Sequence, residues 1–183
     1  MIRDLAGFAR VTGGALQGEN AAFGPVASDS RTLEPGALFV ALAGENFDGH
    51  EFVAQAAARG AAGAVVNRPV AAALAQVIVP DTLGALTSFA NAWRRDFAGT
   101  VVGITGSNGK TTVKEMTGAI LAELGPCLVT QGNLNNHIGV PLTLHRLEAA
   151  LLVRSQPQIH QRREERLQLA RVVAEQRAEQ FVQ

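Results

Sequence analysis

The most informative stretch of the sequence is GITGSNGKTT, residues 103–112. It comes close to the phosphate-binding pattern G-x-x-x-x-G-K-[ST], but Ile104 stands where that pattern has its first glycine. The apolar run TVVGIT predicts a strand over 100–105, and TTVKEMTGAILAEL predicts a helix over 111–124. A strand that ends in a glycine-rich loop and opens a helix is typical of α/β proteins and forms a ready anion site.

The residues of this loop suit a nucleotide triphosphate. N–H groups in the first turn of a helix have no partner inside the helix, and the helix dipole favours negative charge there. Gly106 and Gly109 let the backbone approach phosphate oxygens, Lys110 can reach the terminal phosphates, and the Thr111 hydroxyl can hold Mg²⁺. The alternative is an ordinary turn that happens to contain Gly-Lys. The strand before the loop and the helix after it favour the nucleotide site.

Four parts follow one another along the chain, at 1–80, 81–98, 99–148 and 149–183. The first predicts a small α/β domain, the second a connecting helix, and the third a partial P-loop domain with a parallel sheet. The fourth is dense in Arg and Gln and differs in character from the rest. In the third part, we expect a second strand at 127–130, then an Asn-rich loop and a short helix at 141–147. In the first two parts, the expected elements are strands at 37–42, 62–67 and 76–80, a turn-rich loop at 44–49, and helices at 50–60 and 82–97.

The composition narrows the class of protein. Lys+Arg and Asp+Glu both number 16, so the formal charge is zero, which argues against general binding to nucleic acid or to a membrane surface. No apolar stretch approaches the roughly 18 residues of a membrane-spanning helix, and the amino terminus lacks the apolar run of a signal peptide. The single cysteine, Cys127, fits a reducing compartment. We therefore expect a cytoplasmic protein that is a monomer and binds neither nucleic acid nor membrane.

The residues TGSNGKTT followed by VKEM resemble the Mur ligase family, ATP-dependent enzymes that build the peptide of bacterial peptidoglycan. The phosphate loop of that family has no glycine at the position of Ile104. Two further motifs are similar and stand in the family's order, DSRTLEPGALFVALAGENFDGHEFVAQAAARGAAGAVV at 29–66 and TQGNLNNHIGVPLTLHRL at 130–147. The resemblance covers roughly residues 1–148. It implies an α/β fold, in which a small amino-terminal UDP-binding domain is followed by the start of a P-loop domain with a parallel sheet.

Within the family, the chain most resembles the ligase that adds D-alanyl-D-alanine to UDP-N-acetylmuramoyl-tripeptide. The resemblance implies that ATP phosphorylates a carboxylate to an acyl phosphate, which the amine then attacks. The nucleotide tail and the carboxylate are both anions, so cations must offset their repulsion. Lys110, as the catalytic cation, and Mg²⁺ held through Thr111 are the candidates.

The resemblance also implies binding residues, each with a plainer alternative. Ser30 is the best match for the uridine end, because a hydroxyl can donate or accept a hydrogen bond. Taken alone, the DSR motif reads as a turn or cap, the segment at 45–47 as a turn, and the Asn-rich loop as a left-handed turn. The implied ATP-binding residues are Thr105, Gly106, Ser107, Asn108, Gly109, Lys110, Thr111 and Thr112. The implied substrate-binding residues are Ser30, Arg31, Glu45, Asn46, Phe47, Asn133, Asn135, Asn136 and His137.

The sequence departs from the family after about residue 148. The family continues with an acidic E-x-G strand and a later histidine, which help to bind metal ions, and with a third domain. None of these is recognisable in the tail, which reads as a frameshift, a truncation or a divergent extension. We therefore expect residues 1–98 to be the better-folded part and the chain alone to lack ligase activity. The alternatives are a non-catalytic fragment that binds the UDP precursor or ATP, and another class of P-loop enzyme.

Overall fold

The computed structural model describes residues 2–44, 47–132, 134 and 136–147. Contacts between these residues divide them into two compact units. The first unit contains residues up to 102 together with 128–147, and the second contains 103–127. Among the helices of this described part, none combines the length and apolarity that crossing a membrane requires.

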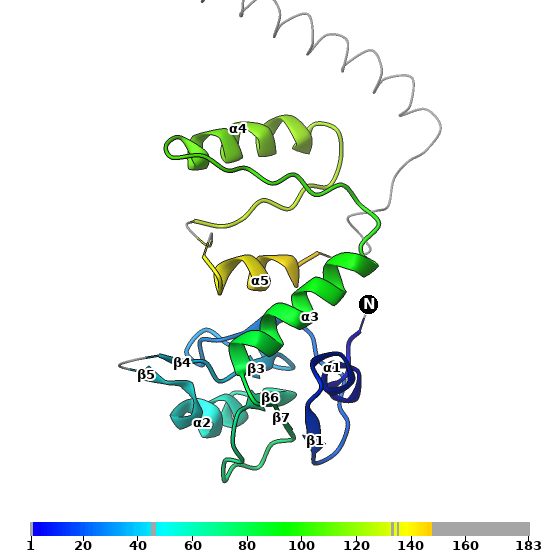
Figure 1. Ribbon diagram of the computed structural model, residues 1–183, viewed down its shortest axis with the longest axis vertical. Coiled ribbons are helices and arrows are strands. Elements are labelled where there is room, and N and C mark those ends of the chain that lie inside the picture. The colour runs from blue at the N-terminus through cyan, green and yellow to red at the C-terminus, as the bar shows by residue number, and fades with distance from the viewer. Residues whose placement is uncertain (1, 45–46, 133, 135, 148–183) are drawn as a thin grey trace, which may run out of the picture. The chain divides into compact units, whose positions relative to one another are not determined.

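A five-stranded sheet is the centre of the first unit (Figure 1). Its strand order is β1-β7-β6-β3-β2, in which β2, β3, β6 and β7 are parallel and β1 is antiparallel to β7. This confirms the expected α/β class. The strands are β1 (Ala15–Gln17), β2 (Val26–Ala27), β3 (Leu38–Val40), β6 (Gly63–Val66) and β7 (Gln76–Ile78).

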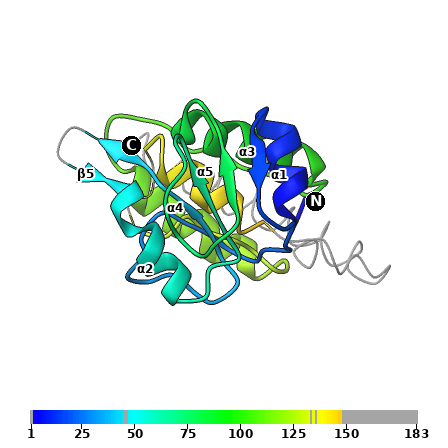
Figure 2. The same ribbon diagram turned by 90° about the horizontal axis from the view of Figure 1, so that it is seen from below.

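Helices cover both faces of this sheet because its central strands are apolar on both sides. All residues of β3 and β6 are buried, as buried parallel strands require. On one face, Phe39, Ala64 and Val66 pack with Val53 and Ala56 of α2 (Val53–Ala58). On the other face, Gly63 lies against the side chain of Leu5 in α1 (Leu5–Thr12). A Cβ at position 63 would be 2.6 Å from the Leu5 side chain. Figure 2 shows α2 on one side of the strands and α1 with α3 (Thr82–Asp96) on the other.

The helix α3 belongs to the core of the first unit. Its apolar residues recur every three or four positions, and Leu86, Phe89 and Trp93 are buried. The Phe89 ring lies 4.6 Å from the ring of Phe8 in α1, measured between centroids. At its start, the Asp81 side chain accepts a hydrogen bond from the N–H of Leu83, as an N-cap does. The segment expected to connect two domains therefore also covers the sheet.

Two parts of the amino-terminal domain differ from the sequence expectations. Residues 2–27, for which no element was predicted, contain α1, β1 and β2. The loop expected at 44–49 contributes to a small antiparallel hairpin of β4 (Ala43–Gly44) and β5 (Phe47–Asp48), followed by the 3₁₀ helix η1 (Gly49–Phe52). These strands of two or three residues are too short to produce a recognisable alternation of apolar and polar residues.

The second unit contains the helix α4 (Lys110–Ala122), which confirms the helix predicted after the glycine-rich loop. The strands predicted at 100–105 and 127–130 are not formed, and this is a correction. A strand is stable only when it pairs with another, and neither segment has a strand partner within the described residues. The described part of the second unit therefore contains no sheet. Nearly all of the buried apolar side chains in the described part lie between Leu5 and Phe97, and Pro141 and Leu147 are the exceptions.

A short helix, α5 (Gly139–Leu144), packs on α3 in the first unit. Two contacts fix its carboxyl end. The indole N–H of Trp93 donates to the carbonyl of Leu147 at 2.8 Å, and the His145 ring stacks on Phe89 with 4.8 Å between centroids. The His145 ring is buried, and neither of its nitrogens makes a hydrogen bond of normal geometry. Burial lowers the pKa of His145 to about 4, although the backbone of Leu86 offsets part of this shift.

This buried histidine predicts a loss of stability in mild acid. Its folded pKa lies below the unfolded value of about 6.5, so the unfolded chain takes up the proton first. The free energy of unfolding should therefore fall as pH decreases from about 6.5 to about 4, by roughly 3 kcal/mol in total from this group. Urea unfolding at several pH values, monitored by the fluorescence of Trp93, the only tryptophan, measures this free energy. His145→Phe keeps a ring between Phe89 and Trp93 and should flatten this part of the pH dependence. An equal slope in both proteins would contradict the prediction.

Candidate functional site

The first candidate site is the edge of the sheet where the parallel strands end. Because β2, β3, β6 and β7 run in the same direction, the residues that follow them emerge at one edge. These are the segments at 28–31, 41–44, 67–68 and 79–82. In parallel sheets, ligands bind beyond the carboxyl ends of the strands. We call this the carboxyl edge, and it brings the DSR motif and the hairpin to the same side of the domain.

The DSR motif at this edge is held by contacts of its own. The Ser30 side chain is buried, and its hydroxyl donates to the side-chain oxygen of Gln55 at 2.6 Å. Arg31 is 79% exposed and binds the Asp29 carboxylate through two nitrogens, at 3.0 and 2.8 Å. The Arg31 side chain and then its backbone N–H lower the pKa of Asp29 to about 2. Ser30 thus anchors the turn, and Arg31 presents an oriented cation to solvent.

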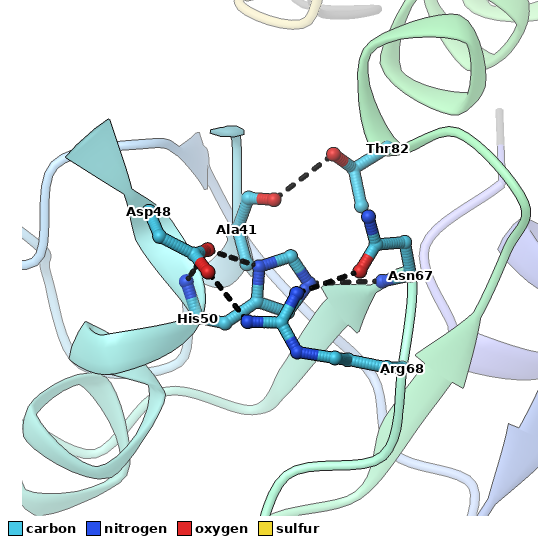
Figure 3. A network of polar contacts seen from close by, with 6 residues as sticks. All are labelled: Ala41, Asp48, His50, Asn67, Arg68 and Thr82. Atoms are coloured by element: carbon cyan, nitrogen blue, oxygen red, sulfur yellow. Dashed lines mark hydrogen bonds and ion pairs between the residues drawn. The ribbon is translucent and has the colours of Figure 1, made fainter. Parts of the chain in front are cut away.

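A polar network ties the hairpin to the end of β6 (Figure 3). The Asp48 carboxylate binds the His50 ring and the Arg68 guanidinium, and the Asn67 N–H donates to His50. Arg68, followed by the backbone N–H and the ring of His50, lowers the pKa of Asp48 well below its usual range. Next to this network, the Thr82 hydroxyl donates to the carbonyl of Ala41 at 2.9 Å. The end of β6 is therefore fastened to the hairpin, and the end of β3 is fastened to the start of α3.

The second candidate site is the glycine-rich loop before α4. Gly106 and Gly109 have φ angles of +151° and +74°, a region that suits glycine because it has no Cβ. No side chain caps the start of α4, so its first N–H groups have no side-chain acceptor. Thr105, Ser107 and Asn108 of the loop and Thr111 and Thr112 of the first turn are exposed. This geometry fits the phosphates of a nucleotide.

Lys110 is the first residue of α4, and its side chain turns back over the loop. Its ammonium group donates to the carbonyls of Gly106 and Ser107, the latter at 3.1 Å. The positive charge is therefore placed within the loop that the sequence assigned to ATP. The residues that the structure describes include no group of three or more His, Cys, Asp and Glu side chains that could hold a metal ion.

The Asn-rich loop is described only in part. Asn133 and Asn135 lie outside the described residues, as do Glu45 and Asn46 of the hairpin. The Asn136 side-chain oxygen accepts from the N–H groups of Ile138 at 3.2 Å and Gly139 at 2.7 Å, so this residue holds the start of α5. His137 is exposed. The residues predicted to bind substrate that the structure describes belong to the first unit, whereas all those predicted to bind ATP belong to the second.

Several residues of the carboxyl edge were missed by the sequence analysis. They are Asp48, His50, Gln55, Asn67, Arg68 and Thr82. Apart from the local pairs of Asp48 with His50 and of Asn67 with Arg68, their partners lie 17 to 41 residues away, so local patterns could not reveal them. The only sequence signal was the position of Asp48-Gly49-His50 within the motif at 29–66.

Two family models match the parts of the chain that contain the candidate sites. The model of the Mur ligase middle domain matches residues 104–153, which begin at the glycine-rich loop. The model described as "Mur ligase family, catalytic domain" matches residues 24–94, which contain the DSR motif and the hairpin. The chain belongs to the Mur ligase family. The DSR motif and the glycine-rich loop, which are far apart in the sequence, thus both lie in segments that match Mur ligase models.

The chain is similar to curated relatives and solved structures from one branch of the family. The UDP-N-acetylmuramoyl-tripeptide–D-alanyl-D-alanine ligase of Escherichia coli is 51% identical over 75% of this chain and 30% of the relative. The ligase of the same name from Bacillus subtilis is 42% identical over 78% of this chain and 32% of the relative. A crystal structure of MurF from Acinetobacter baumannii has a TM-score of 0.73 at 44% identity, covering 78% of this chain and 32% of that one.

MurF ligase from Thermotoga maritima, solved in complex with ADP, has a TM-score of 0.60 at 33% identity. The match covers 68% of this chain and 29% of that one. The chain thus spans about a third of the length of the proteins it matches.

The capping role of Asn136 predicts different stabilities for two variants. Asn136→Ala removes the acceptor for two N–H groups and should lower the free energy of unfolding by about 1 kcal/mol. Asn136→Asp keeps an oxygen acceptor at the same place and should lose much less. Urea unfolding followed by Trp93 fluorescence measures both. Equal stability of the Ala variant and the unaltered chain would contradict the capping role.

Proposed function

We propose that this chain provides two binding sites of an ATP-dependent amide-bond ligase in peptidoglycan precursor synthesis. The carboxyl edge holds the uridine end of UDP-N-acetylmuramoyl-tripeptide, and the loop at 105–112 holds ATP. The incoming amine is D-alanyl-D-alanine. The observation that carries this proposal is the meeting of the DSR motif with the Phe47 hairpin at one edge of a parallel sheet. The names of the relatives supply the substrates.

The carboxyl edge has the chemistry that a nucleotide sugar needs. Arg31 offers an exposed guanidinium whose orientation Asp29 fixes, which suits an anionic diphosphate. Phe47 is 50% exposed and stacks on Phe52 with 5.4 Å between centroids, so one ring face has a rigid support. The Ser30 hydroxyl donates to Gln55 and keeps acceptor capacity for a ligand N–H. Glu45, Asn46, Asn133, Asn135 and His137 remain proposed substrate contacts.

The loop at 105–112 is proposed to bind the ATP phosphates. ATP supplies the phosphoryl group that activates a carboxylate toward an amine. The backbone of the loop and the first turn of α4 would bind the phosphate oxygens, and Lys110 would offset their charge. The exposed Thr111 hydroxyl would take part in holding Mg²⁺. The ADP complex of the related Thermotoga maritima ligase supports the nucleotide part of this assignment.

The proposal extends to the organisation of the protein. We infer that residues 1–80 bind the UDP precursor, that 81–98 connect this domain to the next, and that 99–148 belong to the ATP-binding domain. A protein with balanced charge that acts on UDP-linked precursors is proposed to be cytoplasmic and monomeric, with no nucleic-acid partner.

A second candidate function is binding without chemistry. The groups that the structure orients, Arg31 at the carboxyl edge and Lys110 over the loop, are binding groups, and they would equally serve a module that holds the UDP precursor or ATP. Phosphate release from the 183-residue chain with ATP, UDP-N-acetylmuramoyl-tripeptide and D-alanyl-D-alanine separates the two candidates. We expect no release that depends on D-alanyl-D-alanine. Release that requires all three substrates would favour a ligase that works within these residues.

The two lysines of the chain provide a matched test of the ATP site. Lys110→Ala removes the cation over the loop and should weaken ATP binding at least about tenfold in titration calorimetry. Lys114→Ala is the control, because Lys114 lies one turn further along α4 and pairs with Glu115 at 3.0 Å. Neither variant should change the affinity for the UDP precursor. Unchanged ATP affinity in the Lys110 variant would show that the loop is not the nucleotide site.

A further inference from the structure

The segment Asp48-Gly49-His50 connects the hairpin to the rest of the carboxyl edge (Figure 3). Asp48 ends β5, directly after the exposed ring of Phe47, and His50 lies in η1. The Asp48 side chain accepts from the backbone N–H of His50 at 3.0 Å and so holds the start of η1. The segment is thus placed between the residue that would meet the substrate and the body of the sheet.

The two ring nitrogens of His50 have fixed and opposite roles. The Asn67 N–H donates to Nε2 at 3.0 Å, so Nε2 is the acceptor and the proton of the ring lies on Nδ1. Nδ1 faces the Asp48 carboxylate oxygen at 2.6 Å and donates to it. The His50 side chain is only 2% exposed. With both nitrogens occupied and the ring buried, His50 cannot take a proton from a substrate, and its role is to hold other groups in place.

Gly49 adds a second tie at the same point. Its N–H donates to the carbonyl of Leu42 at 2.7 Å, just after β3. A Cβ on Gly49 would lie 2.6 Å from that carbonyl oxygen, so only glycine allows this approach. The hairpin base is therefore joined to the exit of β3 through Gly49 and to the exit of β6 through His50.

The hairpin needs such ties because it is too small to fix its own orientation. Each of its strands has two residues, and an isolated hairpin even of full length is only marginally stable in water. Phe47 at the start of β5 is half exposed and contributes little burial. The contacts at Asp48, Gly49 and His50, together with the stack of Phe47 on Phe52, consequently set the direction in which the Phe47 ring points.

We propose that His50 is a positioning residue for the substrate site. Through the Asp48 carboxylate and the Asn67 N–H, it fixes the hairpin so that Phe47 faces the uridine end of the UDP precursor. The inference rests on the proposed function, because the precursor is the ligand assigned to this edge. The same network orients Arg68, whose guanidinium binds both Asp48 and the side-chain oxygen of Asn67, at 3.3 Å for the latter.

Three variants of the full chain test this proposal. His50→Leu keeps similar bulk and removes both hydrogen bonds, whereas His50→Gln offers an amide oxygen that can accept from Asn67. Gln76→Leu is the control. Gln76 is buried at the start of β7, and its amide makes two hydrogen bonds to the backbone of Val70, at 2.9 and 2.7 Å. Like His50, Gln76 is a buried side chain that holds a loop through hydrogen bonds, but it lies at the end of β7 that is away from the carboxyl edge.

Calorimetry with UDP-N-acetylmuramoyl-tripeptide and hydrogen–deuterium exchange of peptides covering 43–49 are the two measurements. His50→Leu should weaken precursor binding about tenfold and speed hairpin exchange by a similar factor. His50→Gln should recover most of both effects. Gln76→Leu should leave the affinity of the folded protein and the hairpin exchange within about twofold. ATP affinity should be unchanged in all three. Nitrogen NMR of the unaltered chain should find the His50 proton on Nδ1.

The outcomes separate this proposal from the function it rests on. If the unaltered chain does not bind the precursor, the proposed function fails and the inference falls with it. If the unaltered chain binds but His50→Leu binds equally well, the positioning role alone is wrong. An equal loss of affinity in Gln76→Leu, or an Nε2-protonated ring at His50, would also overturn it.

Discussion

The parallel direction of β2, β3, β6 and β7 is the constraint on which the rest of the amino-terminal domain depends. Segments that follow parallel strands must leave the sheet at the same edge, whatever their separation in the sequence. This places Asp29–Arg31, the hairpin of β4 and β5, and Asn67 at the same edge of the sheet. Had any of these strands been antiparallel, its polar segment would lie at the far edge. Because β3 and β6 are apolar on both faces, polar side chains that could bind a ligand are placed at the ends of these strands.

The two units differ in how their elements are stabilised. In the first, α1, α2 and α3 bury apolar faces against a sheet, and the buried strands supply the contacts that fix each helix. In the second, α4 exposes Val113, Met116 and Ile120, and Gly118 is its one buried residue. Its helical form agrees with two local features, the spacing of Val113, Met116 and Ile120 by three and four residues and the glycine before its first residue. The glycine-rich loop is likewise local, since its shape follows from Gly106, Gly109 and the turned-back Lys110.

This difference explains how far the sequence could predict the fold and the site. The helix after GSNGK and the helix at 82–96 were predictable because their signals are contained in the segment itself, in a glycine-rich start or an apolar spacing of three and four. The strands expected at 100–105 and 127–130 had the right composition, but a strand also needs a partner that composition cannot supply. At the carboxyl edge the contact of Asp48 with Arg68 joins residues 20 positions apart, and beside α5 the contact of Trp93 with Leu147 joins residues 54 positions apart. Such pairs depend on the completed sheet and on α5 meeting α3, so no local pattern contains them.

The motif residues divide into those that hold the backbone and those that remain available to a ligand. Ser30 binds Gln55, Asn136 caps α5, and His50 joins Asp48 to Asn67, and each is buried or occupied by these contacts. Arg31, Phe47 and His137 belong to the same motifs but are exposed. A side chain that is already oriented contributes more to binding free energy than a mobile one, because ordering a mobile side chain on binding has an entropic cost. Each of these motifs therefore combines side chains that fix the local backbone with side chains that the fold leaves exposed and oriented.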